Sequence, residues 1–447
     1  MCLERSKPSI LERMIFVDAI RTELMPGVIL TCLKNNKFKT GCLSLNLITQ
    51  LSRENAARNA VIPHVLRRGT GLHPDMDSIL AALDGLYGSS IEPSVRKYGE
   101  MQTVGFHASF PEDAFIPQGK ILDGVLPLLG EMLLNPRTRG GLLLPAYVSG
   151  EKDKLLEKIR GRINDKRAYS LFRLKELMCC TEDYAVGPLG NEAEAEAIHY
   201  QRLTRHYREL LSSSPIEIIY CGMADPDTVS AMLTDVLASL PRADLNEDLG
   251  TDIRMNTLED SPRYFSEALD VTQGKLAMGF RLGDCMDDPD PAALRVFNAL
   301  YGGSVTSKLF MNVREKLSLC YFASSAVDFH KGVMLVSSGI DFDKYDAAKD
   351  EILIQLDAVR NGDFSSDELE AARRAVSTEL RTISDDPNEL TRFWLSQNLA
   401  GLDCSPEDLA ALAEEITAEE IVEIARGVEL DAVYFLHGEE VNENADA

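Results

Sequence analysis

The histidines of this chain offer little metal-binding chemistry. A catalytic zinc ion is usually held by three protein side chains, chiefly histidines and carboxylates at fixed spacing. The chain has seven histidines, and none of them lies in an H-E-x-x-H or H-x-x-E-H pattern. His199 and His206 share one face of an expected helix, but two turns (about 11 Å of rise) separate them, which is too far for both rings to reach one ion. We therefore expect surface or capping roles for this pair.

Other catalytic signatures are missing from the sequence as well. It contains no G-x-S-x-G, no P-loop and no G-x-G-x-x-G after a strand. Its nine cysteines include no C-x-x-C pair, and the adjacent Cys179 and Cys180 form neither a zinc clip nor a routine disulfide. Scattered thiols of this kind are typical of a reduced, intracellular protein. Motifs of these kinds therefore reveal no catalytic centre.

Composition and charge narrow the class of protein. With 447 residues, 45% hydrophobic and 26% charged, the chain is globular and long enough for two to four domains. Its net charge of −25 argues against nucleic acid as a partner. The acidity serves either solubility or an acidic cavity that attracts cationic peptides. No apolar run has the ~18–20 residues of a membrane span, and residues 1–20 lack the apolar core of a secretory signal. We expect a soluble cytoplasmic protein.

The hydrophobic pattern predicts a mixed order of strands and helices in the first half. Two β-rich runs flank Asn35-Asn36 and predict a hairpin. Apolar spacing then predicts helices, a strand, more helices and a last buried strand. The strands are expected at 28–33, 38–48, 100–110 and 216–220, and the helices at 54–68, 76–87, 122–134 and 147–162, with a further helix ending at 178.

A similar order returns in the second half, which indicates an internal duplication. Strands are expected at 275–281, 335–340 and 433–436, and helices at 292–301, 343–361 and 367–381. The single tryptophan, Trp394, is expected in the core. Strands and helices do not alternate strictly, so α+β is favoured over α/β. We predict two homologous domains, 1–240 and 262–447, each a mainly antiparallel sheet with helices on one face, joined by a polar linker at 241–261.

Two segments carry a resemblance to a known family. Residues 59–70 read Asn-Ala-Val-Ile-Pro-His-Val-Leu-Arg-Arg-Gly-Thr, and Leu-Asp-Gly-Leu-Tyr-Gly follows at 83–88. Residues 301–310 read Tyr-Gly-Gly-Ser-Val-Thr-Ser-Lys-Leu-Phe and run into Asn-Val-Arg-Glu-Lys-Leu-Ser-Leu-Cys-Tyr at 312–321. Together they closely resemble the pitrilysin (insulinase, mitochondrial processing peptidase) family of zinc peptidases. The likeness extends over nearly the whole chain, including both halves.

The resemblance implies that the zinc motif has been lost. Family members carry H-x-x-E-H on a helix that ends in Gly-Thr, and counting back from Gly69-Thr70 places the second histidine on His64. The general-base glutamate falls on Pro63, which cannot deprotonate a water, and the first histidine falls on Ala60. A downstream glutamate completes the family's site; Glu151 and Glu157 are both candidates for it here. The resemblance implies that this chain has no metal of its own and that zinc is on a partner chain.

The resemblance also implies that a second functional pair is retained. The family's late arginine and tyrosine match Arg314 and Tyr321, with Glu315-Lys316 intact and Ser318 where glycine is usual. In active relatives this pair contacts the substrate carbonyl and the developing oxyanion at the zinc of another half, because both side chains donate hydrogen bonds. In the alternative interpretation Arg314 pairs with a nearby carboxylate and Tyr321 only packs.

We therefore expect a non-catalytic subunit of a two-chain zinc metallopeptidase. It would supply Arg314 and Tyr321 to a homologous zinc-bearing chain and bind peptide along a sheet edge. Within the family the likeness is greatest to paired Gram-positive bacterial members that carry a label for association with aminopentanol modification of elongation factor P. One alternative is a purely structural scaffold, as in respiratory complexes built on this fold. Another is a hydrolase active alone through an unforeseen centre.

Overall fold

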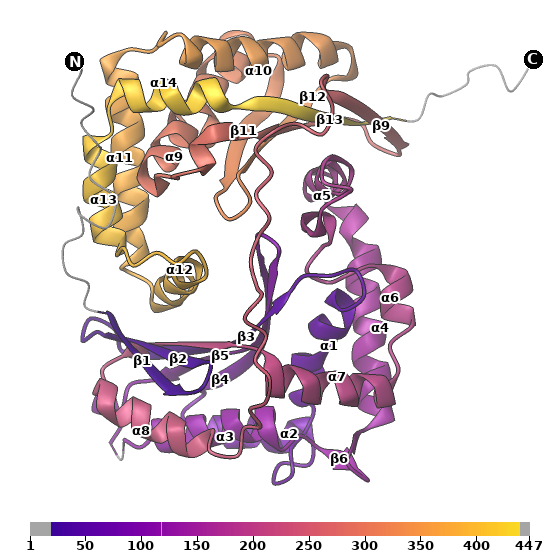
Figure 1. Ribbon diagram of the computed structural model, residues 1–447, viewed down its shortest axis with the longest axis vertical. Coiled ribbons are helices and arrows are strands. Elements are labelled where there is room, and N and C mark those ends of the chain that lie inside the picture. Colours follow the sequence, from indigo (N-terminus) through magenta and orange to yellow (C-terminus); the bar gives the residue numbers. More distant parts are fainter. Residues whose placement is uncertain (1–18, 118, 439–447) are drawn as a thin grey trace, which may run out of the picture.

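A computed structural model of the chain describes residues 19–117 and 119–438, and its two main β-sheets lie in opposite halves of the molecule (Figure 1). The N-terminal sheet has six strands in the order β1-β2-β8-β3-β5-β4. Their bounds are Ala19–Met25 (β1), Val28–Lys34 (β2), Ile216–Gly222 (β8), Thr40–Gln50 (β3), Met101–Pro111 (β5) and Ser90–Tyr98 (β4).

The C-terminal sheet has five strands in the order β11-β12-β10-β13-β9. Their bounds are Cys320–Asp328 (β11), Val333–Ile340 (β12), Gly274–Arg281 (β10), Glu429–Gly438 (β13) and Arg263–Leu269 (β9). A separate pair of two-residue strands, Thr138–Arg139 (β6) and Leu142–Leu143 (β7), lies outside both sheets.

The two sheets repeat one topology strand for strand. In each sheet three consecutive strand pairs are antiparallel, β4-β5-β3-β8 in the first and β11-β12-β10-β13 in the second. In each sheet the next strand is parallel, β2 beside β8 and β9 beside β13. Strand β1 has no counterpart in the C-terminal sheet. The predicted α+β fold with two homologous, mainly antiparallel halves is confirmed.

The predicted hairpin around Asn35-Asn36 is wrong. Strands β2 and β3 are not neighbours, because β8 lies between them, parallel to β2 and antiparallel to β3. The hairpin partner of β2 is instead β1, joined to it through a turn in which Gly27 has a φ of +67°, a conformation that favours glycine. Local pattern identified both strands correctly, but a strand that returns from far along the sequence took the place between them.

Helices cover one face of each sheet and form a continuous core with it. The N-terminal helices are α1 (Ala56–Leu66), α2 (Met76–Gly85), α3 (Leu122–Leu134), α4 (Pro145–Gly161), α6 (Glu192–Glu196), α7 (Tyr200–Ser213) and α8 (Pro226–Val236). The C-terminal helices are α9 (Pro291–Asn298), α10 (Tyr345–Arg360), α11 (Ser366–Ile383), α13 (Pro406–Glu415) and α14 (Ala418–Gly427). Two π-helical segments, Ala299–Gly303 and Leu309–Lys316, follow α9.

The halves exchange one helix each across the middle of the molecule (Figure 1). Helix α5 (Lys166–Met178) belongs to the first half in sequence but packs on β10 and β13 of the second sheet. Helix α12 (Pro387–Leu399) does the reverse and packs on β3 and β8 of the first sheet. Trp394 lies in this core, as predicted. Each sheet is therefore covered on its second face by a helix of the other half.

The segment between the halves is irregular. Residues 241–261, predicted as a polar linker, have no helix or strand and run from one half to the other (Figure 1).

None of the helices in the described part of the chain is both long and apolar enough to cross a membrane.

A buried group of six charged side chains joins the halves at the centre. Its three cations and three anions are Arg263, Arg281, Lys331, Glu100, Glu182 and Asp431. Arg281 and Lys331 have fully buried side chains and come from the second half, whereas Glu182 comes from the first. Arg281 Nη2 donates to Glu182 Oε1 over 2.6 Å, and Lys331 Nζ lies 2.8 Å from Glu182 Oε2.

The same group also fixes the linker and neutralises its own charges. Lys331 Nζ is 2.6 Å from Glu100 Oε1 and also donates to the backbone carbonyl of Asp252 in the linker. Burial opposes ionisation of Glu182, but the hydrogen bonds from Arg281 and Lys331 outweigh that effect and lower the pKa of its carboxyl. Such a group stabilises the fold only while every member is paired, since an orphaned buried charge is costly.

We expect Lys331→Met to lower the free energy of unfolding by about 3–5 kcal/mol, because it leaves buried Glu100 without its cation and Glu182 with Arg281 but without Lys331. Chemical denaturation at neutral pH measures the change. The matched control is Lys34→Met, which removes an exposed ion pair with Asp225 and should cost less than about 1 kcal/mol. Equal costs for the two substitutions would contradict the role given to the buried group.

Candidate functional site

The degenerate zinc-motif positions lie on helix α1, next to a cavity of the first half. Ala60 and His64 are one turn apart on α1, and Ala60 and Pro63 are buried. His64 lines a cavity of about 290 Å³. The other residues of its wall all belong to the first half: Val61, Arg67, Met76, Glu92, Pro93, Glu151, Lys154, Leu155, Lys158 and Leu189.

Of the two glutamates that the sequence left open, Glu151 is the one beside His64. Both lie on helix α4, but only Glu151 lines the cavity, and its side chain is 6% exposed, whereas Glu157 is exposed. Two cations already neutralise Glu151: Arg68 Nη1 lies 3.2 Å and Lys154 Nζ 2.8 Å from its Oε1.

The surroundings of His64 are electropositive. Burial is the main cause that lowers the pKa of its imidazole, and the charge of Lys158 lowers it further. Lys154 and Arg67 act in the same direction, and Glu151 opposes them. His64 therefore stays neutral down to a lower pH than an ordinary histidine does.

These residues do not fit a catalytic zinc ion. Such an ion takes three protein ligands and needs a general base for its water. Here one imidazole and one carboxylate remain, the carboxylate is paired with Arg68 and Lys154, and Pro63 replaces the base. Among residues 19–117 and 119–438, no group of three or more His, Cys, Asp or Glu side chains is arranged to hold a metal ion. Cationic side chains provide the positive charge that a metal would bring.

The Arg314–Tyr321 segment lies in the second half and has a specific backbone shape. Arg314 is in the π-helical segment Leu309–Lys316, which buries Leu309 and Val313. The chain then turns through Ser318, which has a φ of +50°. That left-handed conformation favours glycine, which explains why glycine is usual at this position in the resemblance above.

Both side chains of the pair point into solvent rather than into the core. Arg314 is 41% exposed, its guanidinium lies over the ring of Phe310 at 4.7 Å, and its closest carboxylate is that of its neighbour Glu315 at 3.5 Å. Tyr321 is 58% exposed, and its hydroxyl donates to Asp341 Oδ1 over 2.9 Å. This hydrogen bond to a carboxylate raises the pKa of Tyr321. A packing role for Tyr321 is therefore wrong, whereas Arg314 does have a carboxylate nearby.

The structure brings His64 and Glu151 together but leaves Arg314 and Tyr321 apart from them. Neither of the pair lines the His64 cavity. The two places nevertheless lie at equivalent positions of the two sheets. The terminal strand β4 lines the His64 cavity, and its counterpart β11 carries Tyr321. Both strands expose an unpaired backbone edge, and Pro93 removes one N–H donor from β4.

The burial of one histidine near α1 differs from the expectation drawn from the sequence. His199 is exposed as expected, but His206 is buried, so a surface role for it is wrong. Its Nε2 lies 2.6 Å from Asn59 Oδ1, and Asn59 Nδ2 donates to Gln102 Oε1. Burial lowers the pKa of His206 to about 4, so it stays neutral and donates within this chain of polar groups. The helical periodicity around His206 would have placed it on the inner face of α7.

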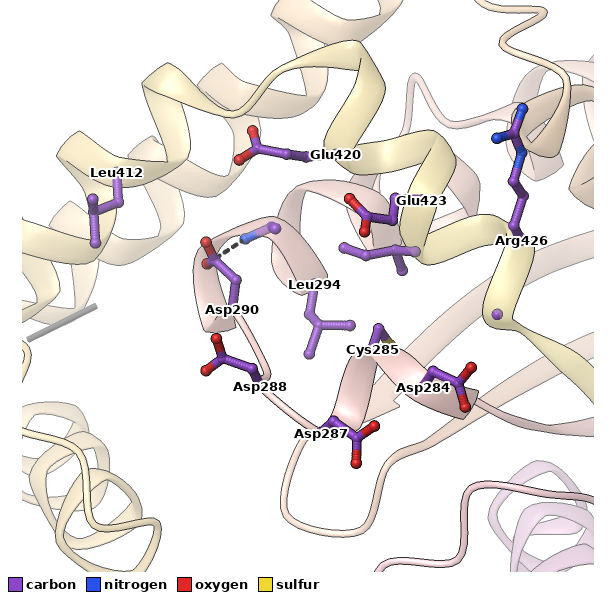
Figure 2. A pocket seen from close by; sticks show the side chains of 13 residues that line it. Asp284, Cys285, Asp287, Asp288, Asp290, Leu294, Leu412, Glu420, Glu423 and Arg426 are labelled. Carbon is purple, nitrogen blue, oxygen red and sulfur yellow. Dashed lines mark hydrogen bonds between the residues drawn. The ribbon is translucent and has the colours of Figure 1, made fainter. Parts of the chain in front are cut away.

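Acidic side chains gather around another concavity of the second half (Figure 2). It has a volume of about 570 Å³, an apolar floor that includes Leu294, and a rim of Asp284, Asp287, Asp288, Asp290, Glu420 and Glu423. Asp290 is already engaged, since its carboxylate accepts from the first N–H groups of α9. Burial raises the pKa of the Cys285 thiol to about 11, so this wall holds no thiolate at neutral pH.

Comparisons with known proteins agree with this geometry. The family described as "Peptidase M16 inactive domain" matches residues 197–376. The chain is 32% identical over 417 residues to the "Probable inactive metalloprotease YmfF" of Bacillus subtilis, covering 93% of this chain and 96% of that protein. It is 23% identical to the B. subtilis "Antilisterial bacteriocin subtilosin biosynthesis protein AlbE" over 68% of this chain and 76% of that one.

A solved structure also has this fold. The crystal structure of a conserved protein from Enterococcus faecalis V583 superposes with a TM-score of 0.85 at 24% identity, covering 96% of this chain and all of that one (100%).

We expect the purified chain to hold fewer than about 0.1 zinc ions per molecule after mild dialysis, because too few ligands remain for a catalytic ion. Elemental analysis measures the content, and an H-x-x-E-H homologue purified in the same way is the control. One tightly held zinc ion per chain would contradict this expectation.

Nuclear magnetic resonance titration of His64 should give a midpoint below 6.5, the ordinary value for histidine. Lys158→Gln should raise the midpoint because it removes a repelling cation, and Glu151→Gln should lower it because it removes an attracting anion. A wild-type midpoint at or above 6.5 would contradict the electropositive surroundings described here.

Proposed function

Since the chain belongs to the pitrilysin, or M16, peptidase family, we propose that it is the non-catalytic subunit of a two-chain zinc metallopeptidase. Its partner is a homologous chain that carries the intact zinc motif. This chain supplies Arg314 and Tyr321 to the partner's zinc and contributes half of the chamber that binds the peptide.

The asymmetry between the two motifs carries the proposal. At the zinc-motif positions, Ala60 and Pro63 have no ligand and no base, and Glu151 is paired with cations. Arg314 and Tyr321, in contrast, are exposed side chains with hydrogen-bond donors. Their partners in this chain, Glu315 and Asp341, have exposed side chains as well. A guanidinium and a phenol hydroxyl stabilise negative charge that develops on a substrate carbonyl. Neither residue lines the cavity at His64, so a second chain is the natural place for their action.

The free edge of β11 is the proposed binding site for the peptide. It is a terminal strand, its free edge offers backbone N–H and C=O groups, and Tyr321 is its second residue. An extended peptide added along β11 would pass beside Tyr321, as in β-augmentation generally. The equivalent strand β4 is less suitable, because Pro93 lacks an N–H. The net charge of −25 favours a cationic peptide over nucleic acid.

We also place the protein in the cytoplasm. All eight cysteines of the described residues are free thiols. Burial raises the pKa of Cys32, Cys42 and Cys221 to about 12, so they remain protonated and unreactive. A reducing compartment agrees with this state.

Affinity capture of the full chain, carrying a tag, from its own cells tests the pairing. The expected result is a co-purifying H-x-x-E-H homologue, with zinc and peptidase activity in the complex only. Capture of a complex without peptidase activity would favour the scaffold alternative. Activity of the isolated chain that survives a chelator would favour a hydrolase active alone.

In the assembled enzyme, Arg314→Ala and Tyr321→Phe should each lower kcat about 100-fold, the usual effect of losing an oxyanion donor. Steady-state kinetics on a peptide substrate measures the change. Arg374→Ala and Tyr264→Phe are matched controls, since Arg374 is 69% and Tyr264 57% exposed on other surfaces of the same half. If all four variants keep wild-type turnover, the pair has no part in catalysis.

A further inference from the structure

A small cavity of the second half contains polar groups that the protein leaves without partners. It has a volume of about 250 Å³ and lies among α9, α11, α12 and the end of β11. Its polar wall includes Arg295 and Gln397, and its apolar wall includes Phe329, Val376 and Leu294. It shares no residue with the His64 cavity or with the Arg314–Tyr321 pair.

Gln397 is the first unsatisfied group. This residue of α12 is 4% exposed, and its Oε1 is buried and accepts no hydrogen bond within the described part of the chain. An unmade hydrogen bond of a buried amide costs about 1–3 kcal/mol, so such groups usually have a partner in the functional state. Rotation of the amide about χ3 exchanges oxygen and nitrogen, so Gln397 can offer an acceptor to a molecule in the cavity.

Arg295 is the second unsatisfied group. It lies on α9 and is half-buried. Within the described part of the chain, no carboxylate oxygen lies within 4.0 Å of its guanidinium nitrogens, so it forms no ion pair. Glu379 of α11 lines the same cavity and acts on Arg295 only at longer range. A guanidinium keeps its charge and has five donors in a fork that matches a carboxylate. Because it is unpaired, the fork is able to bind a carboxylate in the cavity.

The remaining hydroxyl of the wall is already used. Ser396 Oγ lies 2.8 Å from His330 Nε2. The wall also includes Asn298, whose Oδ1 already accepts from Ser325. The cavity therefore combines the cationic fork of Arg295, the carboxylate of Glu379, the free acceptor of Gln397 and an apolar surface. At about 250 Å³ it is smaller than the roughly 300–1,000 Å³ that hold drug-sized ligands, which limits the occupant to about the size of one amino-acid residue.

We propose that this cavity binds the carboxylate of a small acylated amino acid, either free or as the carboxyl end of a peptide. Arg295 binds the carboxylate with two parallel hydrogen bonds. Gln397 accepts a hydrogen bond from the amide N–H of the ligand. The apolar side chain of the ligand packs against Phe329 and Val376. The site is independent of the proposed partnership with a zinc chain.

Isothermal titration of the full chain tests this site with matched probes. N-acetyl-L-leucine should bind with a Kd of about 1 mM or tighter, and N-acetyl-L-leucinamide, which lacks the carboxylate, at least tenfold more weakly, since about 1.4 kcal/mol corresponds to tenfold. This comparison uses the wild-type protein, so it does not depend on any variant folding. Equal binding of the acid and the amide, or binding of neither, would overturn the proposal.

Variants and a longer probe refine the assignment. Arg295→Met should remove the preference for the acid over the amide, and Gln397→Met should weaken the acid several-fold. Arg374→Met, on the outer surface of α11, is the control and should bind as the wild type does. Unchanged binding in Arg295→Met would overturn the proposal. A tetrapeptide ending in leucine with a free carboxyl group separates the two sources: tighter binding than N-acetyl-L-leucine supports a peptide end, and weaker binding supports a free acid.

Discussion

Three cations and three anions meet in the buried centre of the molecule, and neither half supplies equal numbers of cations and anions. Glu100 and Glu182 come from the first half, and their counterions Arg281 and Lys331 come from the second. Because a buried charge without its partner is costly, the halves must close on one another before this group is satisfied. The linker is held by the same lysine through the Asp252 carbonyl. The orientation of the two sheets, and of every site built on them, depends on this closure.

The exchange of α5 and α12 adds an apolar constraint to this ionic one. Each helix covers the second face of the opposite sheet, so neither sheet can keep both faces dry by itself. On this common frame the two halves have diverged. Helix α1 carries Pro63 and borders a cavity that is rich in lysine and arginine. The second half instead presents Arg314 on a π-helical turn and Tyr321 on an edge strand. The motif positions of the first half lack the ligands of a catalytic zinc ion, and the second half presents exposed hydrogen-bond donors.

The sequence predicted most elements and the duplication because their apolar periods are strong and local. It also located Ala60, Pro63 and His64 on a helix and identified the Arg314–Tyr321 segment through a resemblance. It failed where the answer depends on distant residues. The strand that separates β2 from β3 is β8, which follows long after both in the sequence. The polar partner of buried His206 is Asn59 of another helix, which in turn donates to Gln102 of a strand.

The sequence by itself determined the fold class, the repeat and the loss of a ligand set, since Ala60 and Pro63 lack the necessary groups in any conformation. Only the tertiary structure decided that Glu151 rather than Glu157 lies beside His64, that Arg68 and Lys154 neutralise it, and that Arg295 and Gln397 share a cavity without protein partners. The physical reason is that side-chain chemistry is fixed residue by residue. Burial, pairing and electrostatic surroundings arise only when segments far apart in the chain pack together.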